Sequence, residues 1–233
     1  MLTEISDELK SGKPVLIFDG ENREGETDIV AASQFVDDRM IRFMRKEGGG
    51  LICTTLKEED ARKLGLPFIE DFFREHLPVS RNLFDSSDLK YDTSSSFSVT
   101  INARDTFTGI PDSDRSRTIR ELSGFLNEMP LYNGQSLEIF SRTFRVPGHV
   151  HLIIAREGYF SRRKGHTELS TYLVEKAGLV PSATIVEMLD DDGKALSKEK
   201  AMKYAYENSL KFIEGSTIID EWNNDQSHGN GSL

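Results

Sequence analysis

An acidic segment between two apolar runs is the part of the sequence whose residue types most directly suggest chemistry. Residues 19–28 (DGENREGETD) contain five carboxylates and one arginine. The flanking runs 16–18 and 29–32 are apolar and partly β-branched, which predicts a strand on each side. Carboxylates held this close repel one another, so we expect a divalent cation or Arg23 to compensate them. The alternative interpretation is an acidic, solvated hairpin tip.

A second segment, 163–167 (RKGHT), combines two basic residues, a glycine, a histidine and a threonine at the predicted start of a helix. Backbone N–H groups at a helix N-terminus, the helix dipole and a guanidinium all favour a bound phosphate. The pattern predicts that Arg163 and the backbone hold phosphate while His166 binds a metal. A capped surface helix with solvated basic residues would have the same sequence.

Two further residues lie in predicted strands. His149 follows Pro147-Gly148 at the start of a strand, where it is either a structural histidine or a proton carrier. Glu187 lies in the apolar run 183–189, where an ionised carboxylate is costly unless it is paired or bound. Facing the core side of the sheet, Glu187 would suit general acid or base catalysis. Facing solvent on an edge strand, it would be the polar half of an alternating pattern.

Composition limits the class of protein. The chain has 233 residues, 29% of them charged, and a net charge of −10, so nucleic acid and anionic membranes are repelled on average. An anionic substrate therefore needs a local basic pocket. We expect a cytoplasmic protein, because we find neither a signal peptide nor an apolar window long enough to span a membrane. The single cysteine, Cys53, is consistent with a reducing compartment, and its apolar surroundings predict a small core residue.

The order of periodic segments predicts an α+β fold with a mixed sheet in an α/β/α-type sandwich. Strands are predicted at 15–18, 29–35, 51–55, 95–102, 144–155 and 183–189. Helices are predicted at 3–12, 37–46, 57–63, from a cap at Asp114, and at 166–177 and 197–208. Residues 66–92 show no sustained period and are predicted as helix and loop. We expect a single catalytic domain over residues 1–222 and a disordered Asn-, Gly- and Ser-rich tail over 223–233.

Six segments occur together in the order and spacing of one enzyme family. The chain resembles 3,4-dihydroxy-2-butanone 4-phosphate synthase from about residue 3 to 215. The matching segments are 19–28, 49–53, Thr108-Gly109 with Asp114-Arg115 and Thr118, 147–149, 163–168, and Glu187.

The resemblance implies a lyase of riboflavin biosynthesis. Such an enzyme converts D-ribulose 5-phosphate to L-3,4-dihydroxy-2-butanone 4-phosphate and formate with Mg²⁺, or Mn²⁺ as a substitute, and without an organic cofactor. It implies a cytoplasmic homodimer with the active site near the subunit interface, and the length predicts the monofunctional form. The metal ligands would be Glu24 and His166. The catalytic residues would be Asp28, His149 and Glu187. Substrate contacts would come from Arg23, Glu24, Asp28, Thr108, Asp114, Arg115, Thr118, Arg163, Lys164, Gly165, His166, Thr167 and Glu187.

Two other functions use the same residues. A metal-dependent phosphosugar isomerase or aldolase needs similar carboxylates, a histidine and a phosphate pocket, and formate among the products would distinguish the synthase from it. A catalytically silent metabolite-binding protein would be expected to lack Glu24, His166 or Glu187, and all three are present.

Overall fold

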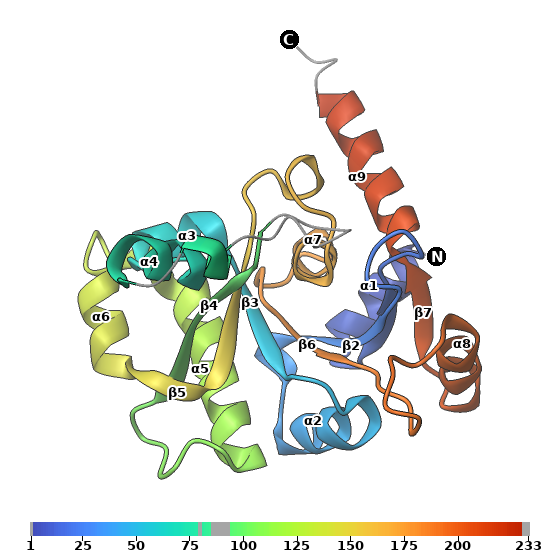
Figure 1. The fold of residues 1–233 in the computed structure, drawn as a ribbon, viewed down its shortest axis with the longest axis horizontal. Coiled ribbons are helices and arrows are strands. Elements are labelled where there is room, and N and C mark those ends of the chain that lie inside the picture. Colours follow the sequence, from blue (N-terminus) through green and yellow to red (C-terminus); the bar gives the residue numbers. More distant parts are fainter. Residues whose placement is uncertain (1, 79–80, 85–93, 230–233) are drawn as a thin grey trace.

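The computed structural model describes residues 2–78, 81–84 and 94–229, and its centre is a mixed β-sheet (Figure 1). Within these residues the sheet has seven strands in the order β4-β5-β3-β6-β2-β1-β7. The β3–β5 and β1–β7 pairs are parallel, and the other neighbouring pairs are antiparallel. The strands are β1 (Val15–Phe18), β2 (Thr27–Ala32), β3 (Cys53–Lys57), β4 (Phe97–Ala103), β5 (Phe144–Ala155), β6 (Ala183–Glu187) and β7 (Lys211–Glu214).

Both faces of the sheet are covered, because successive side chains of a strand point to opposite faces. In β1, Leu16 joins one buried apolar cluster and Ile17 joins the other. In β6, Val186 joins the same cluster as Leu16, and Ile185 joins the same cluster as Ile17. This explains why these strands appear in the sequence as continuous apolar runs. Each such side chain contributes roughly 1.5–3 kcal/mol when fully buried.

The helices form a layer on each face of the sheet (Figure 1). Residues of α2, α3, α5, α6 and α8 pack in the first cluster, and residues of α1, α7 and α9 pack in the second. The predicted α+β class with a sheet between helical layers is therefore confirmed. The helices are α1 (Leu2–Lys10), α2 (Asp38–Phe43), α3 (Glu58–Lys63), α4 (Ile69–His76), α5 (Asp112–Glu128), α6 (Ser136–Thr143), α7 (His166–Lys176), α8 (Lys198–Glu207) and α9 (Gly215–Gly229).

Several predicted element boundaries agree with the structure and others shift. Asp37 caps α2 and Ser197 caps α8, as their residue types predict. The strand predicted to reach residue 35 ends at Ala32 and continues as a 3₁₀ turn, Ser33–Phe35. Helix α5 begins before Asp114, whose carboxylate accepts a hydrogen bond from the Gly109 N–H at 2.9 Å instead of capping the helix. Strand β7 and helix α6 were not predicted.

The expectation of a disordered tail from residue 223 is wrong for the residues that the structure describes. Helix α9 continues to Gly229 and projects from the sheet as the red helix of Figure 1. Asp225 fastens it to α7 by accepting hydrogen bonds from the Tyr172 hydroxyl at 2.7 Å and from Lys176. These tertiary contacts outweigh the polar composition on which the expectation rested. Residues 230–233 lie outside the described part.

The segment that showed no period, 66–92, contains helix α4 and a 3₁₀ turn, Arg81–Phe84. Helix α4 buries none of its side chains fully, which accounts for the absence of a clear apolar stripe. Residues 79–80 and 85–93 lie outside the described part. Among the described helices, none combines the length and apolarity that crossing a bilayer requires.

Candidate active site

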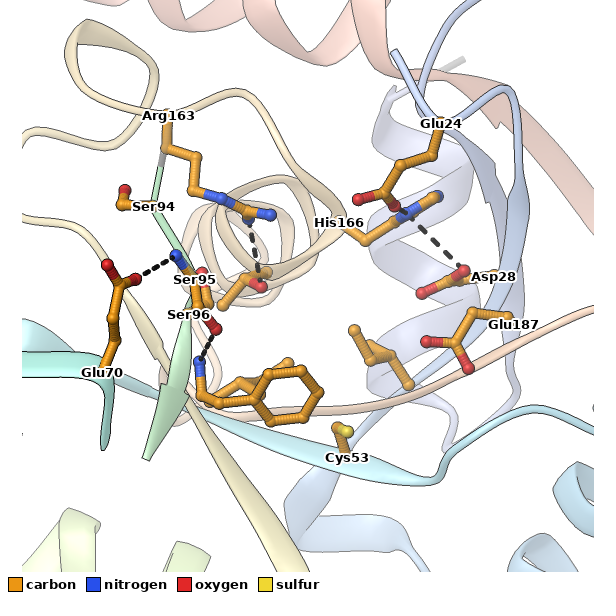
Figure 2. A pocket seen from close by; sticks show the side chains of 14 residues that line it. Glu24, Asp28, Cys53, Glu70, Ser94, Ser95, Ser96, Arg163, His166 and Glu187 are labelled. Carbon is orange, nitrogen blue, oxygen red and sulfur yellow. Dashed lines mark hydrogen bonds and ion pairs between the residues drawn. The ribbon is translucent and has the colours of Figure 1, made fainter. Parts of the chain in front are cut away.

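A cavity of about 280 Å³ lies on the α7 face of the sheet (Figure 2). Its floor includes Cys53 of β3, Ile153 of β5 and Ile185 of β6. Burial raises the pKa of the Cys53 thiol, so this cysteine acts as a small apolar wall, as its sequence context predicted. The walls bring together six residues that the sequence singled out from three separate segments: Glu24, Asp28, Arg163, His166, Thr167 and Glu187.

The acidic loop between β1 and β2 is organised by its first carboxylate. Asp19 is 4% exposed, and its two oxygens accept hydrogen bonds from the Glu24 N–H at 3.1 Å and the Glu26 N–H at 3.0 Å. Arg23 lies 3.5 Å from the same carboxylate through Nε. Arg23 therefore compensates part of the negative charge of the acidic loop, as the sequence suggested it could. This ion pair helps to hold the loop in place beside the cavity.

His166, the first residue of α7, presents one ring nitrogen to the acidic loop. Its Nε2 lies 3.1 Å from the carbonyl oxygen of Ile17, which can only accept a hydrogen bond, so Nε2 carries a hydrogen. Its Nδ1 lies 3.6 Å from Asp28 Oδ1 and 3.8 Å from Glu24 Oε2 (Figure 2). A cation that displaced the Nδ1 proton would leave a neutral ring whose Nδ1 lone pair points toward both carboxylates, as in a metal-ligating histidine.

Burial and charge shift the pKa values of this cluster in opposite directions. Burial raises the pKa of Asp28 to about 8, with further contributions from the neighbouring carboxylates. Burial lowers the pKa of His166, but Asp28 and Glu24 outweigh it and raise that pKa to about 9. The contact with His166 holds the pKa of Glu24 below its usual range. The cluster therefore contains one carboxyl group suited to proton transfer near neutral pH and one that remains ionised.

Glu187 lies beside Asp28 because β2 and β6 are antiparallel neighbours and these two residues are opposite each other in the ladder. Its side chain faces the cavity (Figure 2). Its Oε2 accepts a hydrogen bond from the Leu51 N–H at 2.7 Å. A Cβ atom on Gly50 would lie 2.2 Å from that oxygen. The absence of a side chain at Gly50 thus permits this close approach and leaves room for the Glu187 carboxylate.

Arg163 forms the opposite wall of the cavity (Figure 2). Its guanidinium donates a hydrogen bond to Glu168 Oε2 at 2.9 Å, and Glu168 is completely buried. A Cβ on Gly165 would lie 2.1 Å from Arg163 Nη1, so only glycine permits this guanidinium position. Gly165 also caps α7 without a side chain, which leaves the start of the helix open to an anion.

The other residues singled out from the sequence do not line the cavity. His149, Thr108 and Lys164 are exposed, and Lys164 lies in the loop before α7. Thr118 has a local structural role, because its hydroxyl oxygen accepts a hydrogen bond from the Ala103 N–H at 2.9 Å. Arg115 donates a hydrogen bond to Asp112 at 3.0 Å. Apart from Lys164, these residues and Asp114 form a second group, which lies at the loop after β4, the start of α5 and the bulged part of β5.

A family model described as 3,4-dihydroxy-2-butanone 4-phosphate synthase matches residues 3–221. The chain belongs to this synthase family. A synthase of this name from Archaeoglobus fulgidus is 48% identical over 217 residues, which cover 91% of this chain and 90% of the relative. Another from Methanothermobacter thermautotrophicus is 43% identical and covers 95% of this chain and 96% of the relative.

Solved structures of the synthase family share the fold. A crystal structure of 3,4-dihydroxy-2-butanone 4-phosphate synthase in complex with two magnesium ions has a TM-score of 0.76 and 25% sequence identity. It covers 97% of this chain and 97% of that chain. The same enzyme in a cation-free form gives the same TM-score and identity. The family resemblance inferred from the sequence motifs is thus confirmed by sequence and by fold.

The residues beside the cavity of this synthase-family chain fit a divalent cation. Asp19, Glu24 and His166 each offer one ligand atom, and these atoms lie within 4.8 Å of one another. The two carboxylates offer oxygen donors, which suit magnesium and manganese, and His166 offers a nitrogen donor. Asp28 Oδ1 is buried in the same space and has no hydrogen-bond partner within the described part of the chain, and such an atom is costly unless something else binds it. A cation would supply that interaction and offset the repulsion among the carboxylates.

Sequence reasoning missed several residues at this site. It included Asp19 in the acidic segment but did not name it as a candidate ligand. It also missed Glu70 and the serines 94–96, which line the cavity beside Arg163 (Figure 2). The Ser95 N–H donates to Glu70 Oε2 at 3.3 Å, which ties α4 to the segment before β4. The run of serines before a clear strand was the available signal.

Proposed function

We propose that this chain converts D-ribulose 5-phosphate to L-3,4-dihydroxy-2-butanone 4-phosphate and formate in riboflavin biosynthesis. The observation that carries the proposal is one cavity with three carboxylates and His166 on one side and Arg163 on the other, in a chain that the synthase family model matches over residues 3–221. The carboxylate side suits proton transfers on a sugar. The arginine side suits the phosphate that makes this sugar anionic.

The first chemical step requires a base beside the ketone of the substrate. Asp28 suits this role because its raised pKa makes its ionised form a stronger proton acceptor than an ordinary aspartate. Glu187, opposite Asp28 in the ladder, is placed to serve later proton transfers on the same sugar. We assign the divalent cation to Glu24 and His166, because both Asp19 oxygens already accept main-chain hydrogen bonds. When bound, Mg²⁺ or Mn²⁺ supplies a Lewis acid that stabilises negative charge on sugar oxygens.

The substrate phosphate would bind Arg163 and the N-terminus of α7. The charge-assisted pair with Glu168 fixes the guanidinium beside the cavity, and a guanidinium is a strong donor to phosphate oxygens. We assign Lys164 and Gly165 of the preceding loop and Thr167 of the first turn of α7 to the same phosphate site. Arg23 supports the neighbouring acidic loop through Asp19. This arrangement gives the acidic chain the local basic pocket that an anionic substrate requires.

Replacing Arg163 with lysine should raise KM for ribulose 5-phosphate more than it lowers kcat. Lysine keeps the positive charge beside Glu168 but loses the planar pair of donors, so we expect a roughly tenfold higher KM, equivalent to about 1.4 kcal/mol. Steady-state kinetics would measure both constants. Arg162→Lys makes the same change at the exposed neighbouring position and should leave KM unchanged. An unaltered KM in Arg163→Lys would remove this arginine from the phosphate site.

We also propose that two copies of the chain form a homodimer in which the second group completes the partner's cavity. That group comprises Thr108, Asp114, Arg115, Thr118 and His149. Two observations support the proposal: His149 is exposed outside the cavity of its own chain, and large apolar side chains near it are exposed, namely Phe107, Ile110 and Val146. Light scattering would give the mass in solution. A monomer that produces formate would contradict the proposal.

We further infer that residues 1–222 form one catalytic domain that acts in the cytoplasm. The extent of the family match, 3–221, supports the boundary. The single cysteine is buried at the floor of the cavity, which suits a reducing compartment. Limited proteolysis would test the boundary, because a stable fragment much shorter than residues 1–222 would contradict it.

Incubation of the purified protein with ribulose 5-phosphate and Mg²⁺, with and without EDTA, tests the proposed reaction. We expect formate and the phosphorylated four-carbon product in equal amounts, and we expect both to disappear with EDTA. A new pentose phosphate without formate would instead identify an isomerase. No turnover by the folded protein would indicate a metabolite-binding protein.

A further inference from the structure

Asn102 lies at the end of β4, opposite the point where β5 leaves the ladder. Ile101 pairs with Val150 and Asn102 pairs with Arg145, so residues 146–149 have no partner in β4 and form a bulge. His149 is the last residue of this bulge. The carboxamide of Asn102 lies against it and is almost completely buried, at 3% exposure. A buried amide requires partners for both its oxygen and its nitrogen.

Two main-chain groups fix which way the Asn102 carboxamide points. Its Oδ1 accepts a hydrogen bond from the His149 N–H at 2.8 Å. Its Nδ2 donates a hydrogen bond to the carbonyl oxygen of Thr108 at 3.2 Å. A main-chain N–H can only donate and a carbonyl can only accept, so a flipped amide would lose both bonds. The orientation therefore follows from the backbone and not from the histidine ring.

The fixed amide determines where the His149 ring carries its hydrogen. Nδ2 of Asn102 lies 3.2 Å from His149 Nδ1, and an amide nitrogen can only donate. Nδ1 must then accept, so the neutral ring carries its hydrogen on Nε2. We propose that Asn102 is a positioning residue that holds the exposed His149 as the Nε2–H tautomer, with its Nδ1 toward the amide. The inference deepens the proposed function, because it rests on the role of His149 in turnover.

The backbone around Asn102 leaves its carboxamide little alternative. A Cβ on Gly109 would lie 2.1 Å from Asn102 Nδ2, and this glycine has a φ of +95°, which other residues rarely adopt. A Cβ on Gly148 would lie 2.0 Å from the carbonyl carbon of Ile101. Glycine at both positions lets the loop after β4 and the bulge of β5 close on the amide from two sides. The close packing holds the amide in one place.

The tautomer can be read directly by ¹⁵N NMR of the histidine side chains in the substrate-free protein at alkaline pH. His149→Gln identifies the His149 signals, because they alone disappear. In the wild type we expect a hydrogen on Nε2 and a bare Nδ1. In Asn102→Asp, a carboxylate can only accept, so we expect the hydrogen to move to Nδ1. A wild-type hydrogen on Nδ1, or no change of tautomer in Asn102→Asp, would overturn the proposal.

A matched control separates this effect from a general disturbance of the bulge. Thr100 accepts a hydrogen bond from the Gly148 N–H at 3.0 Å, next to His149, but has no contact with the ring among the described interactions. Thr100→Ala should therefore loosen the bulge and keep the Nε2–H tautomer. A change of tautomer in Thr100→Ala would show that the bulge, and not the amide of Asn102, sets it.

Kinetics then connect the tautomer with turnover. We expect Asn102→Asp to lower kcat at least tenfold with KM for ribulose 5-phosphate little changed, since the tautomer acts on the chemical step and not on binding. An unchanged kcat with a switched tautomer would show that the tautomer has no role in turnover. If the wild type makes no formate, the proposed function fails, whereas the NMR result still decides the role of Asn102.

Discussion

Replacing Glu24 with glutamine is expected to reduce formate formation by roughly 10³-fold, because a bound cation contributes several kcal/mol and each 1.4 kcal/mol corresponds to about tenfold in rate. Glutamine keeps the shape of the side chain and removes the negative charge that faces His166 Nδ1 at 3.8 Å. The fold should be unaffected, since the side chain is 26% exposed in a loop. We expect a change in the free energy of unfolding within about 0.5 kcal/mol.

The measurement combines formate assays with titration of Mn²⁺ followed by electron paramagnetic resonance. Glu24→Gln should weaken Mn²⁺ binding. A defect confined to the substrate pocket would instead leave the Mn²⁺ affinity unchanged. Glu21→Gln is the matched control, because Glu21 is an exposed carboxylate of the same loop that does not line the cavity. Equal Mn²⁺ affinity in Glu24→Gln and the wild type would remove Glu24 from the metal site.

The parts of this site that the sequence predicted are those whose signal is local. The acidic loop stands between two short apolar runs, so its position between β1 and β2 followed from periodicity alone. His166 follows a glycine at a helix start, and that pattern placed it at an N-terminus. The order of the seven strands in the sheet could not be predicted from such local signals, because paired strands such as β2 and β6 are far apart in the sequence.

The remaining features depend on tertiary contacts. Whether Glu187 faces the cavity is decided by its register opposite Asp28, and one residue of slippage would turn it to the other face. Glu70 comes from a helix with no fully buried residue, so no apolar stripe marked it in the sequence. Helix α9 persists past residue 222 because Asp225 binds α7, a contact that composition cannot reveal.

Replacing Asp28 with asparagine should abolish most activity and at the same time stabilise the metal-free protein. Asparagine has the same shape but cannot accept the proton of the substrate, so we expect formate formation to fall by roughly 10²–10⁴-fold. Stability should rise because Asp28 is 1% exposed and its Oδ1 has no hydrogen-bond partner among the described residues. Removing a carboxylate from such a place should raise the free energy of unfolding of the metal-free protein by on the order of 2 kcal/mol.

The stabilisation should depend on pH with a definite sign. Burial raises the pKa of Asp28 from its ordinary value near 3.8 to about 8, and the neighbouring carboxylates add to this rise. Between pH 3.8 and pH 8 the folded protein therefore binds a proton that the unfolded chain releases. The free energy of unfolding therefore falls as pH rises through this range, by up to about 1.4 kcal/mol per pH unit. Asp28→Asn removes this dependence.

Thermal unfolding in EDTA at several pH values between 5 and 8 would measure the difference. The wild-type Tm should fall toward pH 8, and the Tm of Asp28→Asn should fall less and lie above it. Asp7→Asn makes the same change at an exposed carboxylate of α1 and should follow the wild type. Parallel Tm curves for Asp28→Asn and the wild type would show that Asp28 is ionised in the folded protein throughout. Asp28 would then lack the raised pKa that suits it to act as the base, and its neighbour Glu187 would become the stronger candidate.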